Sequence, residues 1–376
     1  MDVVGFLLGA GADPILEDAR GISPFQTAWA PVFTKKCFNE TETAMLSLFS
    51  DPYLLNKFGL TELHKASSNS SNGSFKGMLL SSSRATIDPI DTWGRSTLSW
   101  AAEWGDQKMI QQLLHRGADP NKADELGKTP LHWALGHNSL VSLTTLLSAG
   151  AAINRKDHYG RTTLMLSVQL HDDINITRLL LDSGANMTSR DLWGGTVFHY
   201  AASADHPRVL TYLLERGGDL NVENYSSHTA LEAACSQQSH RALKTLLHHE
   251  KLDHTYIKSR TGATILHVAA WFGDLSTFKV FCAARLKGVN VEKQEQYGWT
   301  ALHLAQWRRD ENAKWSKAAY RPPDQDPAAC YAAFLEVLDS LVDPVLESSF
   351  PRHSRVGLAE AYEAKFEEIS ELESVL

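Results

Sequence analysis

Short apolar segments recur in pairs along the chain, and a turn precedes each pair. Every copy places a hydroxyl residue two positions after the first turn residue, and an apolar residue two positions further on. Successive copies are 33 to 38 residues apart. A period of this length predicts a continuous array of helix pairs rather than separate globular domains. The turn residues are Gly21, Gly59, Gly94, Gly127, Gly160, Gly194, Ser227, Gly262 and Gly298.

The residue types within one copy explain the fold that they predict. Glycine reaches turn conformations that are costly for other residues, and a hydroxyl oxygen can accept from the free N–H groups at a helix start. The apolar residue that follows is present in all nine copies, as a buried seam requires. Small pairs such as Ala101-Ala102 let neighbouring helices approach closely, and Gly-Ala-Asp at 117–119 is typical of a helix end.

One copy carries a complete family signature. Residues 129–134 read Thr-Pro-Leu-His-Trp-Ala and resemble the T-P-L-H-x-A signature of ankyrin repeats, although other copies depart from it. The resemblance covers roughly residues 1–308 and implies an all-α ankyrin-repeat solenoid, in which helix-turn-helix repeats carry β-hairpin fingers. Residues 94–106 are also similar to repeats that are common in filamentous fungi.

The pattern predicts three regions. Residues 1–16 match the second helix and closing turn of a repeat, so the chain either begins with half a repeat or is truncated upstream. Residues 17–309 hold about nine repeats, the first two irregular because of an insertion at 30–44 and a serine-rich segment at 67–74. Residues 310–376 form an irregular helical tail. Its acidic amphipathic C-terminal helix, from Leu358, either caps the last repeat or docks a partner.

Two columns of aromatic residues are candidate contact sites, because the resemblance implies binding through the finger tips and the inner helices. The residue before the turn glycine is aromatic in five copies and is expected to line one edge of the array. A second column follows the small-residue pair on the first helix. Each column has two interpretations, contact with a partner or packing on the neighbouring repeat. The candidate partner-binding residues are Trp93, Trp104, Tyr159, Trp193, Trp271, Phe272, Tyr297 and Trp307.

Charge and composition indicate which kinds of partner and which compartment to expect for the chain. The 36 basic and 44 acidic residues give a net charge of −8, and no basic stripe is present, so direct nucleic-acid binding is not expected. The apolar start at residues 3–8 is far shorter than the roughly 20 residues of a membrane span. The four cysteines are widely spaced, which favours a reduced intracellular compartment, cytoplasm or nucleus. They are Cys37, Cys235, Cys282 and Cys330.

Catalytic and metal-binding patterns are missing from the sequence. Five of the 16 histidines occupy the signature position, where they are expected to hydrogen-bond at the helix start, and no closed ligand set emerges. Neither a nucleophile elbow nor a phosphate-binding loop is present. The sequence therefore predicts a monomer that is not an enzyme and takes no cofactor or metal. The five histidines are His64, His132, His199, His267 and His303.

These observations together predict a non-catalytic scaffold or adaptor that binds a protein partner through its concave face and fingers. The alternative is a transcriptional co-regulator that acts through a partner transcription factor, including one of a fungal secondary-metabolite gene cluster. Such a protein would touch DNA only through its partner, which fits the acidic balance. An enzyme would need chemistry in the tail or in an upstream domain.

Overall fold

The computed structural model describes residues 61, 87–250, 252–253, 255, 261–284, 286, 288–314 and 326–341. The chain divides into two compact units, Met1–Leu246 and Leu247–Leu376. The predicted half repeat, the insertion, the serine-rich segment and the acidic C-terminal helix lie outside the described residues. Each unit is described below by itself.

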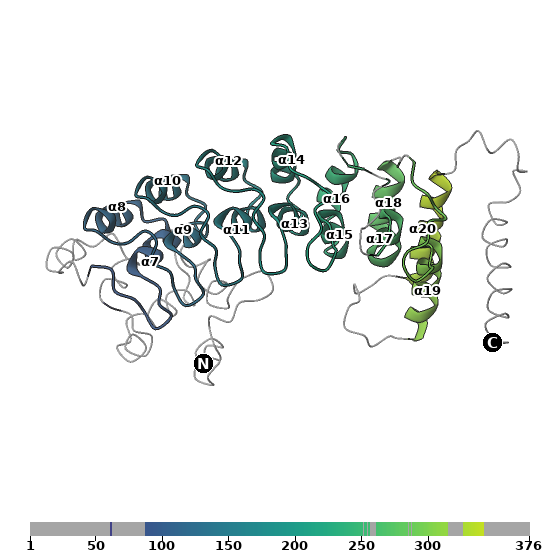
Figure 1. Cartoon of the computed structure of the whole chain (residues 1–376), viewed down its shortest axis with the longest axis horizontal. Coiled ribbons are helices and arrows are strands. Elements are labelled where there is room, and N and C mark those ends of the chain that lie inside the picture. Colours follow the sequence, from purple (N-terminus) through teal and green to yellow (C-terminus); the bar gives the residue numbers. More distant parts are fainter. Residues whose placement is uncertain are drawn as a thin grey trace, which may run out of the picture. The chain divides into compact units, whose positions relative to one another are not determined.

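The described part of the first unit is a stack of helix pairs (Figure 1). Helices α7, α9, α11, α13 and α15 form one row, the inner row, in which α7 contacts α9, and α13 contacts α11 and α15. Their partners form the outer row, in which α10 contacts α8 and α12. The helices are α7 (Thr97–Trp104), α8 (Gln107–His115), α9 (Pro130–Trp133), α10 (Leu140–Ser148), α11 (Thr163–Leu170), α12 (Ile174–Asp182), α13 (Val197–Ser203), α14 (Pro207–Glu215), α15 (Ala230–Ser236) and α16 (His240–Leu247).

The inner helices begin where the hydroxyl residues predict. Ser96 Oγ accepts from Ser99 N at 3.1 Å ahead of α7. Ahead of α9, a capping box forms in which His132 takes the place of the usual Glu or Gln. The described turn residues, from Gly94 to Gly298, adopt the left-handed conformation, including Ser227 at φ 58°, which replaces glycine as the sequence suggested. The all-α repeat architecture is therefore confirmed.

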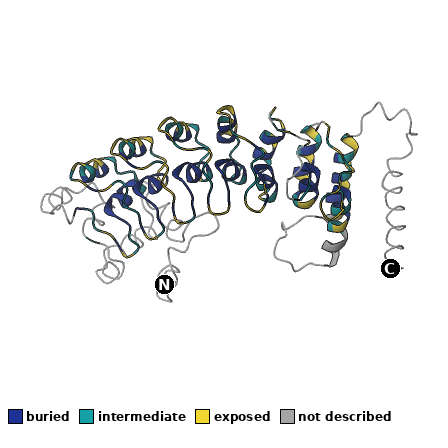
Figure 2. Ribbon diagram, in the orientation of Figure 1, coloured by how far each residue is buried: buried dark blue, intermediate teal, exposed yellow. Residues whose placement is uncertain are grey.

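The core lies between the two rows of helices, and most of the inner row is coloured as buried in Figure 2. In the described copies the apolar residue that follows the hydroxyl is buried, with Leu98 and Leu131 both 0% exposed. Outer helices contribute the other half of the core through residues such as Ile110 and Leu143. Burial of this continuous seam holds each repeat to the next.

The described part of the second unit holds two further helix pairs. Helix α17 (Ile265–Phe272) contacts α19 (Ala301–Lys314), and α18 (Leu275–Ala284) contacts α20 (Pro327–Leu341). The core includes an edge-to-face contact between Phe278 and Phe334, whose ring centroids are 5.6 Å apart. Helix α20 lies within residues 310–376, which the sequence predicts as an irregular helical tail.

Candidate functional site

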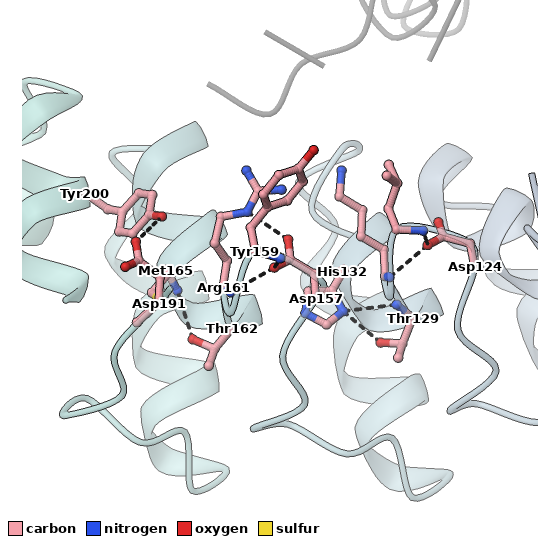
Figure 3. A network of polar contacts seen from close by, with 12 residues as sticks. Asp124, Thr129, His132, Asp157, Tyr159, Arg161, Thr162, Met165, Asp191 and Tyr200 are labelled. Carbon is pink, nitrogen blue, oxygen red and sulfur yellow. Dashed lines mark hydrogen bonds and ion pairs between the residues drawn. The ribbon is translucent and has the colours of Figure 1, made fainter. Parts of the chain in front are cut away.

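A buried carboxylate shapes three successive fingers of the first unit, at Asp124, Asp157 and Asp191. Asp124 Oδ1 accepts from Leu126 N at 2.9 Å and from Lys128 N at 2.8 Å, while Oδ2 accepts from Trp133 Nε1 at 2.9 Å. Asp157 and Asp191 repeat the two Oδ1 bonds to the turn in the next two fingers. Asp157 Oδ2 accepts from Arg161 Nε at 2.7 Å, and Asp191 Oδ2 accepts from the Tyr200 hydroxyl at 2.7 Å (Figure 3). Each carboxylate thus closes its turn, and Asp124 and Asp191 also tie the finger to its own inner helix.

Backbone hydrogen bonds join each finger to the next. Glu125 N donates to Trp93 O at 3.0 Å, Leu192 N donates to Tyr159 O at 3.0 Å, and Tyr225 N donates to Trp193 O at 2.8 Å. In each case the acceptor is the residue before the turn glycine. The backbone therefore places these residues of the first unit in register, and their side chains share one row of finger tips.

Exposed aromatic and apolar side chains gather on these finger tips. Trp193 is 56% exposed and stacks on Tyr159, with ring centroids 6.1 Å apart and planes at 17°. Its neighbours Leu192 and Tyr225 are 62% and 64% exposed. Trp93, in an earlier finger, is half-buried. Of the predicted finger residues of this unit, the structure brings Tyr159 and Trp193 together.

The inner helices carry a second cluster, which buries its charges. The Arg95 guanidinium lies between two tryptophans, with Cζ 4.2 Å from the Trp100 ring centroid and 3.9 Å from that of Trp133. Arg95 forms an ion pair with Glu103. Lys128 Nζ lies 4.6 Å from the Trp133 ring centroid. These contacts are cation–π interactions in a covered environment, where they are strongest.

Trp104, a predicted contact residue, packs at the edge of this cluster. Its ring centroid is 5.0 Å from that of Trp100, and the side chain is half-buried. Arg95 and Lys128 were missed by the sequence reasoning, which treated the residue after the turn glycine as part of the turn. A cation recurs at that position in three successive repeats, Arg95, Lys128 and Arg161.

Burial shifts the pKa values of two side chains close to this cluster, Asp124 and His132. It raises the pKa of Asp124 above the ordinary value, although hydrogen bonds from Lys128 N and the Trp133 indole act in the opposite direction. Complete burial lowers the pKa of His132 from 6.5 to about 4. His132 is therefore neutral near pH 7, and its Nδ1 accepts from Thr129 N at 3.1 Å.

The signature histidines play the helix-start role that the sequence predicts. His199 Nδ1 accepts from Thr196 N at 3.1 Å, and His199 Nε2 pairs with His228 O at 2.9 Å in the next finger. His267 Nε2 pairs with Trp299 O at 3.1 Å in the same way. These imidazoles therefore link one repeat to the next and have a structural role, while His64 lies outside the described residues.

The second unit exposes the largest aromatic group. Trp271 and Trp307, both predicted contact residues, stack with ring centroids 5.7 Å apart and planes at 6°. Trp299 packs edge-on against Trp307 at 6.1 Å and 70°. These three residues are called the tryptophan cluster below, and they are 50%, 42% and 36% exposed in the order Trp271, Trp307, Trp299. Sequence reasoning missed Trp299, which follows the turn residue Gly298.

The two remaining candidate residues of this unit, Tyr297 and Phe272, differ in exposure. Tyr297 is 78% exposed at the finger tip, where Glu295 Oε1 accepts from its backbone N at 2.9 Å. Phe272 is half-buried at the end of α17. Tyr297 is thus available to a partner, whereas Phe272 offers only part of its ring.

Comparison of the sequence with known protein families identifies the family of this chain. A family described as ankyrin repeats, in three copies, matches residues 35–124, 98–191 and 164–256, which together span more than half of the chain. The chain belongs to the ankyrin-repeat family. Ankyrin repeats generally mediate protein–protein interaction, and stacked repeats of this kind offer extended binding surfaces.

Relatives share the ankyrin repeats over limited stretches. The chain is 30% identical over 124 residues to an L-asparaginase of Dirofilaria immitis, covering 33% of this chain and 20% of that protein. It is 31% identical over 112 residues to the nuclear factor NF-kappa-B p105 subunit of Gallus gallus, 29% of this chain and 11% of that protein. Over 112 residues it is also 31% identical to the ankyrin repeat protein FPV223 of fowlpox virus, 30% of this chain and 74% of that protein. The chain thus spans far less than two thirds of the first two relatives.

The described residues show neither a metal-binding cluster nor a membrane-spanning helix. Within that part of the chain, no group of three or more His, Cys, Asp or Glu side chains could hold a metal ion. No helix there is both long enough and apolar enough to span a bilayer. Cys235 and Cys330 are buried, and Cys282 is half-buried.

Proposed function

We propose that this ankyrin-repeat chain is a non-catalytic adaptor that binds another protein through its finger tips and inner-helix tryptophans. The observation that carries the proposal is the row of exposed side chains around the Tyr159–Trp193 stack. Trp193, Leu192 and Tyr225 are each more than half exposed, and backbone bonds between fingers hold them in place. Aromatic side chains on a rigid support are the usual anchors of protein interfaces.

A site-specific photo-crosslinker tests this assignment. A benzoyl-phenylalanine at position 193 is expected to trap a partner protein in extracts of the native cell, identified by mass spectrometry. Val141 provides the matched control, because it is 59% exposed and apolar but lies on outer helix α10. The finger-tip assignment is wrong if positions 193 and 141 trap the same proteins, or if neither position traps any.

A double substitution gives the quantitative test. Replacing Leu192 and Trp193 by alanine is expected to weaken binding of the trapped partner by about 100-fold, because interface anchors of this kind contribute 2 kcal/mol or more. Val141→Ala is expected to leave the affinity unchanged. Titration calorimetry with the purified partner measures both, and circular dichroism checks that each variant stays folded.

The narrower form of the proposal is a transcriptional co-regulator acting through a partner transcription factor. Its support is the acidic net charge of −8 and the likeness of residues 94–106 to fungal repeats. The trapped partner decides between the two forms. A transcription factor, together with nuclear accumulation of a tagged copy that depends on that factor, supports the co-regulator, and a cytoplasmic partner excludes it.

A further inference from the structure

The first unit supplies its own cations to its inner-row aromatic rings. Arg95 lies between Trp100 and Trp133, and Lys128 lies over Trp133. Both cations come from the residue directly after a turn glycine. Arg161 occupies the same position in the next repeat, and its Cζ lies 4.6 Å from the Tyr159 ring centroid. In these three repeats of the first unit, the residue after the turn glycine therefore places its cationic group over an aromatic ring.

The second unit has no cation at the corresponding positions. Ala263 follows Gly262, and Trp299 follows Gly298. Among the residues that the structure describes, no lysine or arginine lies over Trp271, Trp299 or Trp307. Three indole rings are therefore grouped and exposed, and no cation of the described residues lies over them as Arg95 lies over Trp100 and Trp133.

The arginines beside Trp307 are engaged elsewhere. Arg308 donates from Nη1 to Ala270 O at 3.1 Å and to Gly273 O at 2.7 Å. Arg309 has its Cζ 4.5 Å from the Tyr331 ring centroid. These contacts direct both guanidinium groups to other partners than the tryptophan cluster.

Three elements hold the tryptophan cluster in place. Trp271 lies on α17, Trp307 lies on α19, and Trp299 lies at the base of the finger before α19. His267 of α17 pairs through Nε2 with Trp299 O at 3.1 Å, and this contact fixes the finger against the helix that carries Trp271. A surface organised before binding loses less conformational entropy when it binds.

We propose that the tryptophan cluster receives an arginine side chain of a partner protein. Charge supports this occupant, because the chain carries a net charge of −8. Glu295 lies in the same finger and its Oε1 accepts from Trp299 N at 3.3 Å, so a carboxylate is close to the cluster's base. A planar guanidinium stacks on an indole face, as Arg95 does in the first unit. This inference rests on the proposed protein-binding function.

Indole NMR of the full chain tests the proposal directly. The chain has ten tryptophans, and 15N labelling of the indoles gives one resolved Nε1–H signal for each, assigned with single Trp→Phe variants. The probe is acetyl-Gly-Arg-Gly-amide, and the matched control replaces arginine by citrulline, its neutral planar isostere. The arginine peptide is expected to move the signals of Trp271, Trp299 and Trp307 saturably, and the citrulline peptide to bind about tenfold more weakly.

Internal controls make the test specific. The signals of Trp100 and Trp133 are expected not to move, because Arg95 and Lys128 already occupy those rings. Trp307→Ala is expected to abolish the response of the other two cluster signals, and Val141→Ala, on outer helix α10, to leave it unchanged. Equal binding of the two peptides, or shifts spread evenly over all ten signals, would overturn the proposal.

The outcome is separable from that of the proposed function. If the arginine peptide fails while position 193 still traps a partner, the adaptor function stands and the tryptophan cluster loses its assigned occupant. If the peptide binds as described while no partner is trapped, arginine remains the assigned occupant of the tryptophan cluster. The finger tips are then rejected as the partner-binding site.

Discussion

Trp133 of the first unit and Trp307 of the second lie in opposite environments. Trp133 in the first unit is 4% exposed, and both Arg95 and Lys128 lie over its ring. Trp307 in the second unit is 42% exposed and contacts Trp271 and Trp299. The residue after the turn glycine accounts for this difference in exposure. It is an arginine or lysine over the Trp133 ring, and it is another tryptophan, Trp299, beside the Trp307 ring. Trp133, with two cations of its own chain over its ring, is part of the core, while Trp307, with none among the described residues, stays at the surface.

The largest expected effect is on stability and separates these two rings. Trp133→Ala is expected to lower the free energy of unfolding by about 3–5 kcal/mol, because it leaves a cavity and strips Arg95 and Lys128 of their aromatic contact. Trp307→Ala is expected to lower it by about 1 kcal/mol, because much of its ring is already in water. Urea unfolding followed by far-UV circular dichroism measures both variants. Equal losses would mean that the two units do not differ as proposed.

A pH dependence of stability is the next largest effect, and it comes from the buried imidazole of the first unit. His132 has a folded pKa of about 4 against an ordinary 6.5, so between these values the unfolded chain binds more protons. The free energy of unfolding is therefore expected to fall by about 3 kcal/mol as the pH drops from 7 to 4, and the loss is absent above 7. Urea midpoints at several pH values measure the decline.

The variant His132→Gln tests whether this histidine causes the decline in the free energy of unfolding. Glutamine keeps an acceptor for Thr129 N but does not titrate, so the decline is expected to flatten by most of that amount. His303 of the second unit is only half-buried, and His303→Gln is expected to change the pH dependence much less. A decline that is identical in wild type and His132→Gln would assign it to carboxylates instead.

The carboxylate that shapes a finger gives the third effect. Asp124→Asn keeps an oxygen for Leu126 N and Lys128 N, as Asn224 does for its own finger, but turns an amide N–H₂ toward the Trp133 indole N–H. The loss of this acceptor is expected to cost about 1–2 kcal/mol. Urea unfolding provides the measurement, and Asn224→Asp, which faces no tryptophan, is the near-neutral control. A variant as stable as wild type would show that the Trp133 bond adds nothing.

Local patterns made the repeat architecture predictable from the sequence. The hydroxyl residue that precedes each inner helix is a local signal, and Ser96 and Thr162 cap helices as expected. The left-handed Ser227 could also be predicted, because the period places it where other copies have glycine. Helix starts and turns depend on neighbours within a few residues, which the sequence shows directly.

The cation and tryptophan contacts were harder to predict, because they join residues far apart. Arg95 lies over Trp133, in the next repeat along the chain. Trp299 joins Trp307 of its own repeat and, through Trp307, Trp271 of the preceding one. Aligning the copies would have shown Arg95, Lys128 and Arg161 at one position and Trp299 at the same position later. It would not have shown which rings these side chains reach, since that depends on the spacing of stacked repeats.

The smallest expected effect concerns the coupling within the tryptophan cluster. In a double-mutant cycle, Trp271→Ala and Trp307→Ala are expected to show a coupling of about 0.5 kcal/mol in the free energy of unfolding, because stacked aromatic pairs gain little when half exposed. Such a value means that the rings are already stacked before any partner arrives, as a preformed receptor for arginine requires. Strictly additive losses would indicate that the stack forms only when an occupant is bound. The cycle with Tyr159→Ala and Trp193→Ala, a stack of similar geometry in the first unit, sets the scale for this comparison.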